Sequence, residues 1–183
     1  HEVGVVALDA GTTVTVEQSL VIDTLPSTAG YGVGLVCSGA ALSLGTTVVR
    51  SSRTAGVLAA GGCTLSLAES HIDEVLPGSF HQYASNEIIA TFDGISDGLV
   101  VGFGSNATVT NSRVTGSTRA GLLFDASSGL LTGVSTGGAS YGLVVQGEPK
   151  PDYADPQNAF SGTEAAILTD GALPVPEAPP LPQ

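Results

Sequence analysis

The chain contains neither methionine nor tryptophan, and it has only five lysine and arginine residues against 17 aspartate and glutamate residues among its 183. Its formal net charge is −12. Nucleic-acid binding needs clustered cations that neutralise phosphates, so this balance argues against nucleic acid and against an anionic membrane surface as partners. A membrane-spanning helix needs about 18 consecutive apolar residues, and no apolar run approaches that length, so we expect no membrane insertion.

Cysteine is scarce as well, because the chain has only Cys37 and Cys63, too few for a disulfide scaffold. Aligning the repeats described below by their glycines places Cys37 over Ala59, whereas aligning them by their leucines places Ala40 over Cys63. The two thiols are therefore expected near each other but not in one column. The sequence leaves two readings open, a disulfide bridge or two buried small side chains. A zinc site would need two further ligands, so we predict no metal and no cofactor.

A glycine followed by a short aliphatic run recurs through most of the chain. The clear copies begin at Gly34, Gly56, Gly98, Gly121 and Gly142, with weaker copies at Gly4 and Ala166. The copies are spaced by roughly 22 residues, except for a double step between Gly56 and Gly98. We interpret the double step as one turn that is either degenerate or replaced by a loop.

A second pattern follows each glycine segment, with two apolar residues at alternate positions, then Ser or Thr, then a further apolar residue. Leu42, Leu44, Thr47 and Val49 form one copy, and others begin at Val14, Leu65 and Ala107. Alternation with period two predicts strands, and the Gly, Ser and Thr residues between them predict turns. No stretch of about ten residues shows helical spacing, which excludes strands linked by helices.

Short strands that repeat in register predict turns of a parallel β-solenoid, each of which buries its inward side chains only by stacking on its neighbours. An antiparallel β-sandwich is the alternative fold. We assign residues 1–171 to the solenoid domain, with protruding loops at 77–97 and 148–158, and residues 172–183 to a proline-rich tail or linker. Parallel crossovers are right-handed, so we expect a right-handed helix of about six to eight coils.

The segment from Gly56 to Ile72 most clearly resembles the glycine- and alanine-rich coils of large secreted bacterial β-helix proteins, within the pectate-lyase-like right-handed parallel β-helix architecture. The resemblance extends over residues 4–170. It implies an all-β fold and an extracellular or cell-surface location, which the low lysine content and the abundant Ser, Thr and Gly also favour. The chain begins at His1 in strand-like sequence, and we expect it to be a mature or excised part of a longer polypeptide. The fold alone does not define a function, because it supports lyases, hydrolases, adhesins and scaffolds.

The candidate ligand-binding residues lie mainly in the first predicted loop. They are His81, Tyr83, Asp93, Asp97 and, on a neighbouring coil, Asp125. A glycosidase needs two carboxylates at a defined separation, and Asp93 with Asp97 is the only close pair in a suitable loop. A lyase on this fold would also need a basic residue on the repeated strand, and these strands have none. We therefore assign no catalytic residue.

The strand after each glycine is apolar on both faces. Its first and third residues are expected to point inward, yet its second residue is also aliphatic in every copy. These second residues form the predicted interface and include Val36, Leu58, Val100, Leu123, Val144 and Leu168. Such a column is usually covered, either by another chain, by a missing part of the parent protein, or by the long loops and tail. We expect a protein partner, which could be a second copy of the chain. Alternatively, the register is shifted by one residue and the column belongs to the core.

These observations lead to two hypotheses. The first is a non-catalytic structural or binding module of a secreted or cell-surface bacterial protein that acts through a solenoid flank and its loops in adhesion or assembly. Its partner would be a protein, a second copy or a glycan. The second hypothesis is a fragment of a carbohydrate-active β-helix enzyme, either a polysaccharide hydrolase or a lyase.

Overall fold

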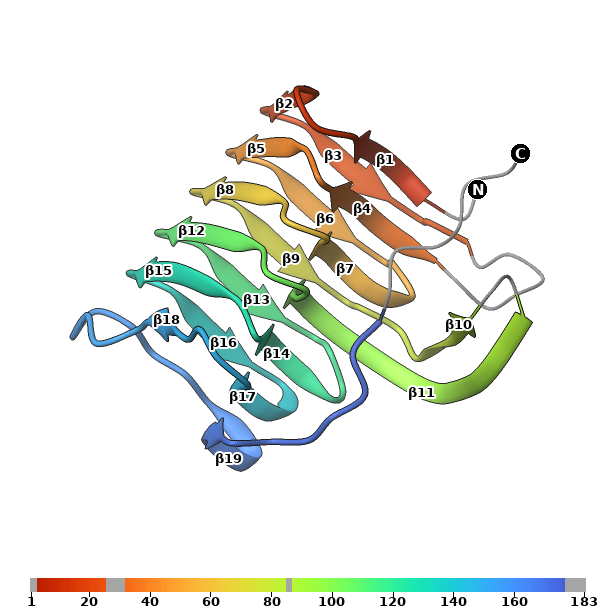
Figure 1. The fold of residues 1–183 in the computed structure, drawn as a ribbon. Helices are drawn as coiled ribbons and strands as arrows, with labels where there is room; N and C mark the ends of the chain where they lie inside the picture. The colour runs from red at the N-terminus through yellow and green to blue at the C-terminus, as the bar shows by residue number, and fades with distance from the viewer. Residues whose placement is uncertain (1–2, 26–31, 85–86, 177–183) are drawn as a thin grey trace.

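A computed structural model describes residues 3–25, 32–84 and 87–176, and Figure 1 shows that they form a stack of strand-built coils. Three sheets run along the stack. Sheet 1 contains β1 (Val3–Leu8), β4 (Val33–Ser38), β7 (Thr54–Ala60), β11 (Glu87–Val101), β14 (Ala120–Asp125), β17 (Ala139–Gln146) and β19 (Gly162–Thr169), with β10 (Gly78–Ala84) paired to β11. Sheet 2 contains β2 (Thr13–Glu17), β5 (Ala41–Gly45), β8 (Thr64–Ala68), β12 (Asn106–Thr110), β15 (Ser128–Thr132) and β18 (Pro151–Asp152). Sheet 3 contains β3 (Leu20–Ile22), β6 (Val48–Arg50), β9 (His71–Asp73), β13 (Arg113–Thr115) and β16 (Ser135–Gly137).

The chain visits the three sheets in turn and then starts the next coil on sheet 1. Neighbouring coils pair in parallel in all three sheets, and among the strands of the described residues only β10 pairs antiparallel, with β11. The predicted fold class is therefore confirmed as an all-β parallel β-helix. Coil spacing in the sequence matches the repeat of glycines, since each glycine segment forms the sheet 1 strand of its coil.

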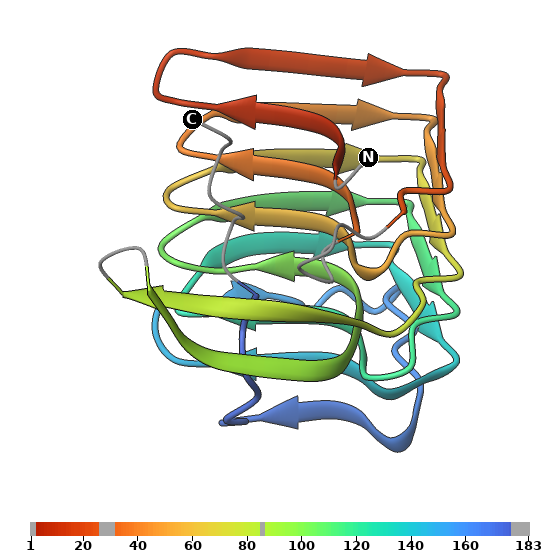
Figure 2. The same ribbon diagram turned by 90° about the vertical axis from the view of Figure 1, so that its right-hand side faces the viewer.

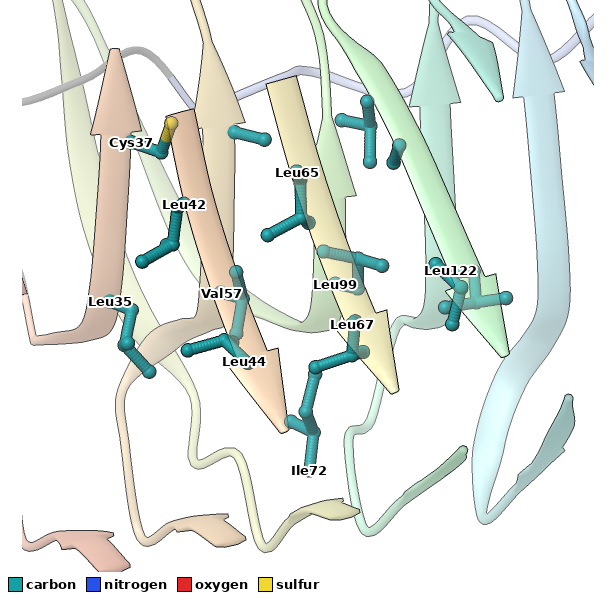
Figure 3. Close-up of a cluster of buried hydrophobic side chains, with 14 of the residues drawn as sticks. Leu35, Cys37, Leu42, Leu44, Val57, Leu65, Leu67, Ile72, Leu99 and Leu122 are labelled. Carbon is teal, nitrogen blue, oxygen red and sulfur yellow. The ribbon is translucent and has the colours of Figure 1, made fainter. Parts of the chain in front are cut away.

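The core lies inside the stack, where like residues sit above one another. Leu35 pairs with Val57, Val57 with Leu99, and Leu99 with Leu122. Figure 3 shows these side chains facing leucines of sheet 2, such as Leu42 and Leu65, across the interior. All of them belong to one cluster of buried hydrophobic side chains. This arrangement confirms the predicted register for the first and third residues after each glycine.

The repeated glycine is required by the close approach of neighbouring backbones. A Cβ atom at Gly98 would lie 2.6 Å from the carbonyl oxygen of Gly121 and would overlap the side chain of Val114 on sheet 3. A Cβ atom at Gly34 would lie 2.5 Å from the Gly56 carbonyl oxygen. Real Cβ atoms do not approach so closely, so only glycine fits where the chain bends from sheet 3 into sheet 1.

The repeated Ser and Thr residues satisfy buried backbone groups between coils. Ser70 Oγ accepts a hydrogen bond from the backbone N–H of Thr47 at 3.0 Å and donates one to the Ala68 carbonyl at 2.8 Å. In the next coil Ser112 Oγ accepts the backbone N–H of Ser70 at 3.1 Å. Backbone hydrogen bonds between coils continue on either side of this position, from the Thr46 N–H to the Ala68 carbonyl and from the His71 N–H to the Thr47 carbonyl, and the serine hydroxyl takes the N–H that lies between them.

The double step in the repeat contains a β-hairpin in place of a missing coil. β10 pairs with the first half of β11, and the second half of β11 then takes its place in sheet 1 directly beside β7. The segment 77–97 therefore differs from the irregular protruding loop that we expected. Figure 2 shows the hairpin crossing in front of the sheet 1 strands. Phe80 is 1% exposed and stacks on Phe92 with ring centroids 4.8 Å apart, which holds the hairpin against this face.

The second expected loop, 148–158, closes the last complete coil. β18 pairs with β15, and Tyr153 packs against the core cluster. The Asn158 side chain accepts the Val134 N–H at 2.9 Å and donates to the Leu131 carbonyl at 2.9 Å, so it ties the segment to the preceding coil. Of the predicted tail, residues 172–176 lie along sheet 1, whereas 177–183 are outside the described residues.

Candidate functional site: the covered outer face of sheet 1

The aliphatic column predicted as an interface lies on the outer face of sheet 1. Val36, Leu58 and Val100 stack in register and are at most 2% exposed. They belong to a second hydrophobic cluster, separate from the core, which also contains Leu123 and Val144 and against which Leu168 is packed. The register expected from the sequence is therefore the observed one, and the column is not part of the core.

The cover over this column comes from the chain itself. Phe80 and Ile95 of the hairpin belong to the same buried cluster, and Leu173 and Val175 of the tail pack against it. Figure 2 shows both segments lying in front of the sheet 1 strands. Among the three covers that the sequence left open, the structure thus contains the long loop and the tail. A partner chain is not required to shield these side chains.

Two polar side chains, one at the end of β17 and one directly before β14, bind the tail by its backbone. Gln146 Nε2 donates to the Leu173 carbonyl at 2.9 Å, and Gln146 Oε1 accepts the Leu173 N–H at 3.0 Å. Arg119 Nη1 donates to the Pro174 carbonyl at 2.8 Å. The tail therefore crosses β17 and then β14 as an extended segment.

Arg119 is itself fixed by Asp97, one of the predicted ligand-binding residues. Its Nε donates to Asp97 Oδ1 at 2.9 Å, and its Nη2 donates to Asp97 Oδ2. The Asp97 side chain is 0% exposed and that of Arg119 is 13% exposed. Burial raises the pKa of Asp97 above its ordinary value, while Arg119 and the backbone N–H of Ala120 oppose part of this shift. Asp97 thus orients a cation that holds the tail.

Asp125, the third carboxylate of the predicted site, lies away from Asp97. It is on β14 five positions beyond Ala120, the residue that pairs with Asp97. Five residues of strand extend over about 16 Å. This separation of Cα atoms is larger than the roughly 10 Å between the carboxyl groups of a glycosidase, and both oxygens of Asp97 are already bonded to Arg119. Asp125 instead accepts a hydrogen bond from Gln146 Nε2 at 3.1 Å.

The remaining candidates are on the hairpin. Asp93 is exposed and accepts a hydrogen bond from Ser79 Oγ at 2.6 Å, across the two strands. His81 Nδ1 lies 2.9 Å from Thr91 Oγ1, also across the hairpin. The Tyr83 backbone pairs with Ile88, and the Tyr83 side chain lies outside the described residues. These contacts hold the two strands together and leave Asp93 facing solvent.

The two cysteines form a disulfide between adjacent coils. Cys37 is at the end of β4, Cys63 is in the turn before β8, and their Cα atoms are 5.8 Å apart. Both are almost completely buried. Cys37 does pair with Ala59, as the glycine alignment predicted, so the bridge runs diagonally across the turn.

An exposed ion pair lies at the end of β6 in sheet 3. Arg50 donates to both carboxylate oxygens of Glu74 at 2.8 and 2.6 Å, which raises the pKa of Arg50 and lowers that of Glu74. The pair lines a shallow hollow with Leu20 and Ile22. Solvent-exposed ion pairs contribute little stability. The two charges of this pair are bonded to each other, so the hollow does not direct either of them at a ligand.

Across residues 3–25, 32–84 and 87–176, no group of three or more His, Cys, Asp or Glu side chains could hold a metal ion. The same part of the chain has no helix long and apolar enough to cross a membrane.

Sequence reasoning missed Arg119, Gln146 and the tail residues that they hold. One signal was present: Asp97 is the only charged residue in a column otherwise formed by Val, Ala and Tyr. A lone charge in a covered apolar column requires a partner. With only four arginines in the chain, Arg119 on the adjacent coil was the available choice.

Comparisons with known proteins give no relative. No protein family, no curated protein and no solved structure matches the chain.

Proposed function

We propose that this chain is a non-catalytic structural and binding module of a secreted or cell-surface bacterial protein, and that it works in adhesion or assembly. The observation that carries the proposal is the use of Arg119 and Gln146, which bind the backbone of another segment at the outer face of sheet 1. The polar groups of this face therefore hold polypeptide. A flank that binds extended chain by its backbone suits a protein that attaches to other proteins.

A secreted or surface location is supported by chemistry as well as by composition. Disulfides persist in oxidising compartments, and the Cys37–Cys63 bridge links two coils of this module. A solenoid of this kind, with a disulfide between two of its coils, is also rigid, because each coil contacts its neighbours along three sheets. Rigidity and resistance to unfolding are useful at a cell surface.

The enzyme hypothesis has less support from the geometry. Both carboxylate oxygens of Asp97 are bonded to Arg119, and the tail lies over the pair. Asp125 bonds to Gln146, which also holds the tail. Asp97 and Asp125 are thus engaged with the two side chains that hold the tail, which leaves Asp93 as the solvent-facing carboxylate of the candidate set.

Two assays on the intact, oxidised chain test the proposal. In the first, the chain is incubated with pectin-like and alginate-like polysaccharides, and newly formed chain ends are measured. We expect none, and turnover that disappears in Asp93→Asn or Asp97→Asn would overturn the proposal. In the second, beads coated with the chain should attach to surfaces coated with bacterial envelope material more strongly than albumin-coated beads. Equal attachment would count against an adhesive role.

A further inference from the structure

The segment Gly171–Pro176, called the strap below, occupies a surface that has the properties of a peptide-binding site. We propose that the outer face of sheet 1 across β11, β14 and β17 binds an extended, proline-containing peptide from another polypeptide. The peptide would carry apolar side chains on either side of a proline, and the strap is the occupant supplied by the chain itself. This inference rests on the proposed function and names a partner for the same flank.

The polar recognition at this surface depends on the backbone of the strap. Gln146 pairs with both the N–H and the C=O of Leu173, as the edge of a neighbouring strand would, and Arg119 binds the carbonyl of Pro174. No side chain of the strap takes part in these three hydrogen bonds. A different polypeptide could therefore provide the same groups, because every residue carries a backbone carbonyl and every residue except proline an N–H.

The apolar contacts define which peptide would fit. Leu173 and Val175 pack against the outer-face cluster of sheet 1, on either side of Pro174. Gly102 leaves room for the Val175 side chain, because a Cβ atom added at Gly102 would lie 3.3 Å from Val175 Cγ1. Proline keeps such a segment extended before it binds, which lowers the entropy lost on binding. The preferred sequence is thus apolar-Pro-apolar-Pro, as in Leu-Pro-Val-Pro of residues 173–176.

The strap can leave this surface without disturbing the coils. Within the described ranges, no hydrogen bond between main-chain atoms joins residues 171–176 to a strand of the solenoid. The hairpin differs in this respect, since β11 continues into sheet 1 and pairs with β7 and β14. A tethered strap acts at an effective concentration of order millimolar, so it suppresses binding of a free peptide until it is weakened.

The test measures binding of a fluorescein-labelled peptide, Gly-Ala-Leu-Pro-Val-Pro-Glu, to the full chain by fluorescence anisotropy. Leu173→Ser with Val175→Ser removes both apolar contacts of the strap and leaves the receiving surface intact. We expect this double variant to bind the peptide at least tenfold more tightly than the unmodified chain. Adding Gln146→Ala should reverse most of that gain. Thr108→Ala, on the outer face of sheet 2, is the matched control and should change nothing.

Hydrogen exchange at the amide of residue 173 reports whether the strap has been released. Fast exchange in the double variant, with peptide binding that depends on Gln146, would support the proposal. Fast exchange without peptide binding would overturn it, as would an amide that stays protected after both side chains are removed. Unchanged circular dichroism confirms that each variant is folded. Failure of peptide binding leaves the adhesion and turnover assays unaffected, so the two proposals can fail separately.

Discussion

Arg119 and Asp97, on adjacent coils, form an ion pair beneath the tail in which the carboxylate is completely buried and both of its oxygens accept hydrogen bonds from the guanidinium. The same guanidinium binds the carbonyl of Pro174. Arg119 therefore links two coils, neutralises the buried carboxylate and attaches the tail. Replacing Arg119 should affect all three.

Arg119→Ala should destabilise the folded chain by about 3–5 kcal/mol at neutral pH, because it leaves a buried carboxylate without its partner. Urea unfolding followed by circular dichroism measures this loss. Arg50→Ala is the matched control, since Arg50 forms an exposed pair with Glu74, and its removal should cost at most about 1 kcal/mol. Equal losses in the two variants would contradict the structural role of Arg119.

The stability loss in Arg119→Ala should also depend on pH. The pKa of Asp97 is raised by burial, so the folded chain holds its proton at a pH where the unfolded chain has released it. Stability therefore falls as pH rises from about 4 towards the folded pKa. Without Arg119 that pKa rises further, and the loss relative to the unmodified chain should grow by up to about 1.4 kcal/mol per pH unit. In an Asp97→Asn background, Arg119→Ala should show no such dependence.

Removing the disulfide by Cys37→Ala with Cys63→Ala should lower the free energy of unfolding by about 3–4 kcal/mol, as expected for a bridge that closes a loop of this length. Thermal and urea unfolding of the oxidised chain and of the double variant measure the difference. A reductant should destabilise the unmodified chain and leave the double variant unaffected. Equal stability of the two proteins would show that the thiols are not bridged in solution.

Gly98→Ala should destabilise the solenoid by about 2–3 kcal/mol, because the new methyl group would collide with the Gly121 carbonyl and with Val114. Gly137→Ala provides the control, since the nearest atom to a Cβ there is Ser161 Oγ at 3.5 Å. Its stability should stay within about 0.5 kcal/mol of the original. If both variants unfold at the same urea concentration, the close backbone approach does not explain the repeated glycine.

Phe80→Ala should cost about 3–5 kcal/mol, because the ring is buried between Phe92 and the outer face of sheet 1. Ile88 lies on the same hairpin and is 54% exposed. Ile88→Ala should therefore lower the free energy of unfolding by less than about 0.5 kcal/mol. Unfolding by urea measures both. A small effect of Phe80→Ala would show that the hairpin contributes little to stability, as expected of a protruding loop.

Local rules within the sequence were sufficient to predict the coils. The glycine repeat, the alternating aliphatic residues and the Ser or Thr before β3, β6, β9 and β13 recur because each coil meets the same backbone and the same interior. The second aliphatic residue of the sheet 1 strands indicated that the outer face is covered, and it is covered from Val36 to Val144, whereas Val6 at the first strand is 41% exposed. For the cysteines, the two alignments gave neighbouring but different columns, and only the observed path of the turn showed that the bridge runs diagonally between Cys37 and Cys63.

The identity of the cover was decided only by tertiary structure. Phe80, Leu173 and Val175 reach sheet 1 from segments that carry no repeat, so no register placed them on the column. Asp97 and Arg119 are 22 residues apart, and Gln146 and Leu173 are 27 apart, and these distances in sequence say nothing about which side chains meet. A stacked coil is specified by its neighbours, whereas the hairpin and the tail are specified by the apolar outer face that they cover, and the tail also by the Asp97–Arg119 ion pair beneath it. That difference is why the sequence alone determined the solenoid, and why the site on its flank emerged only from the folded chain.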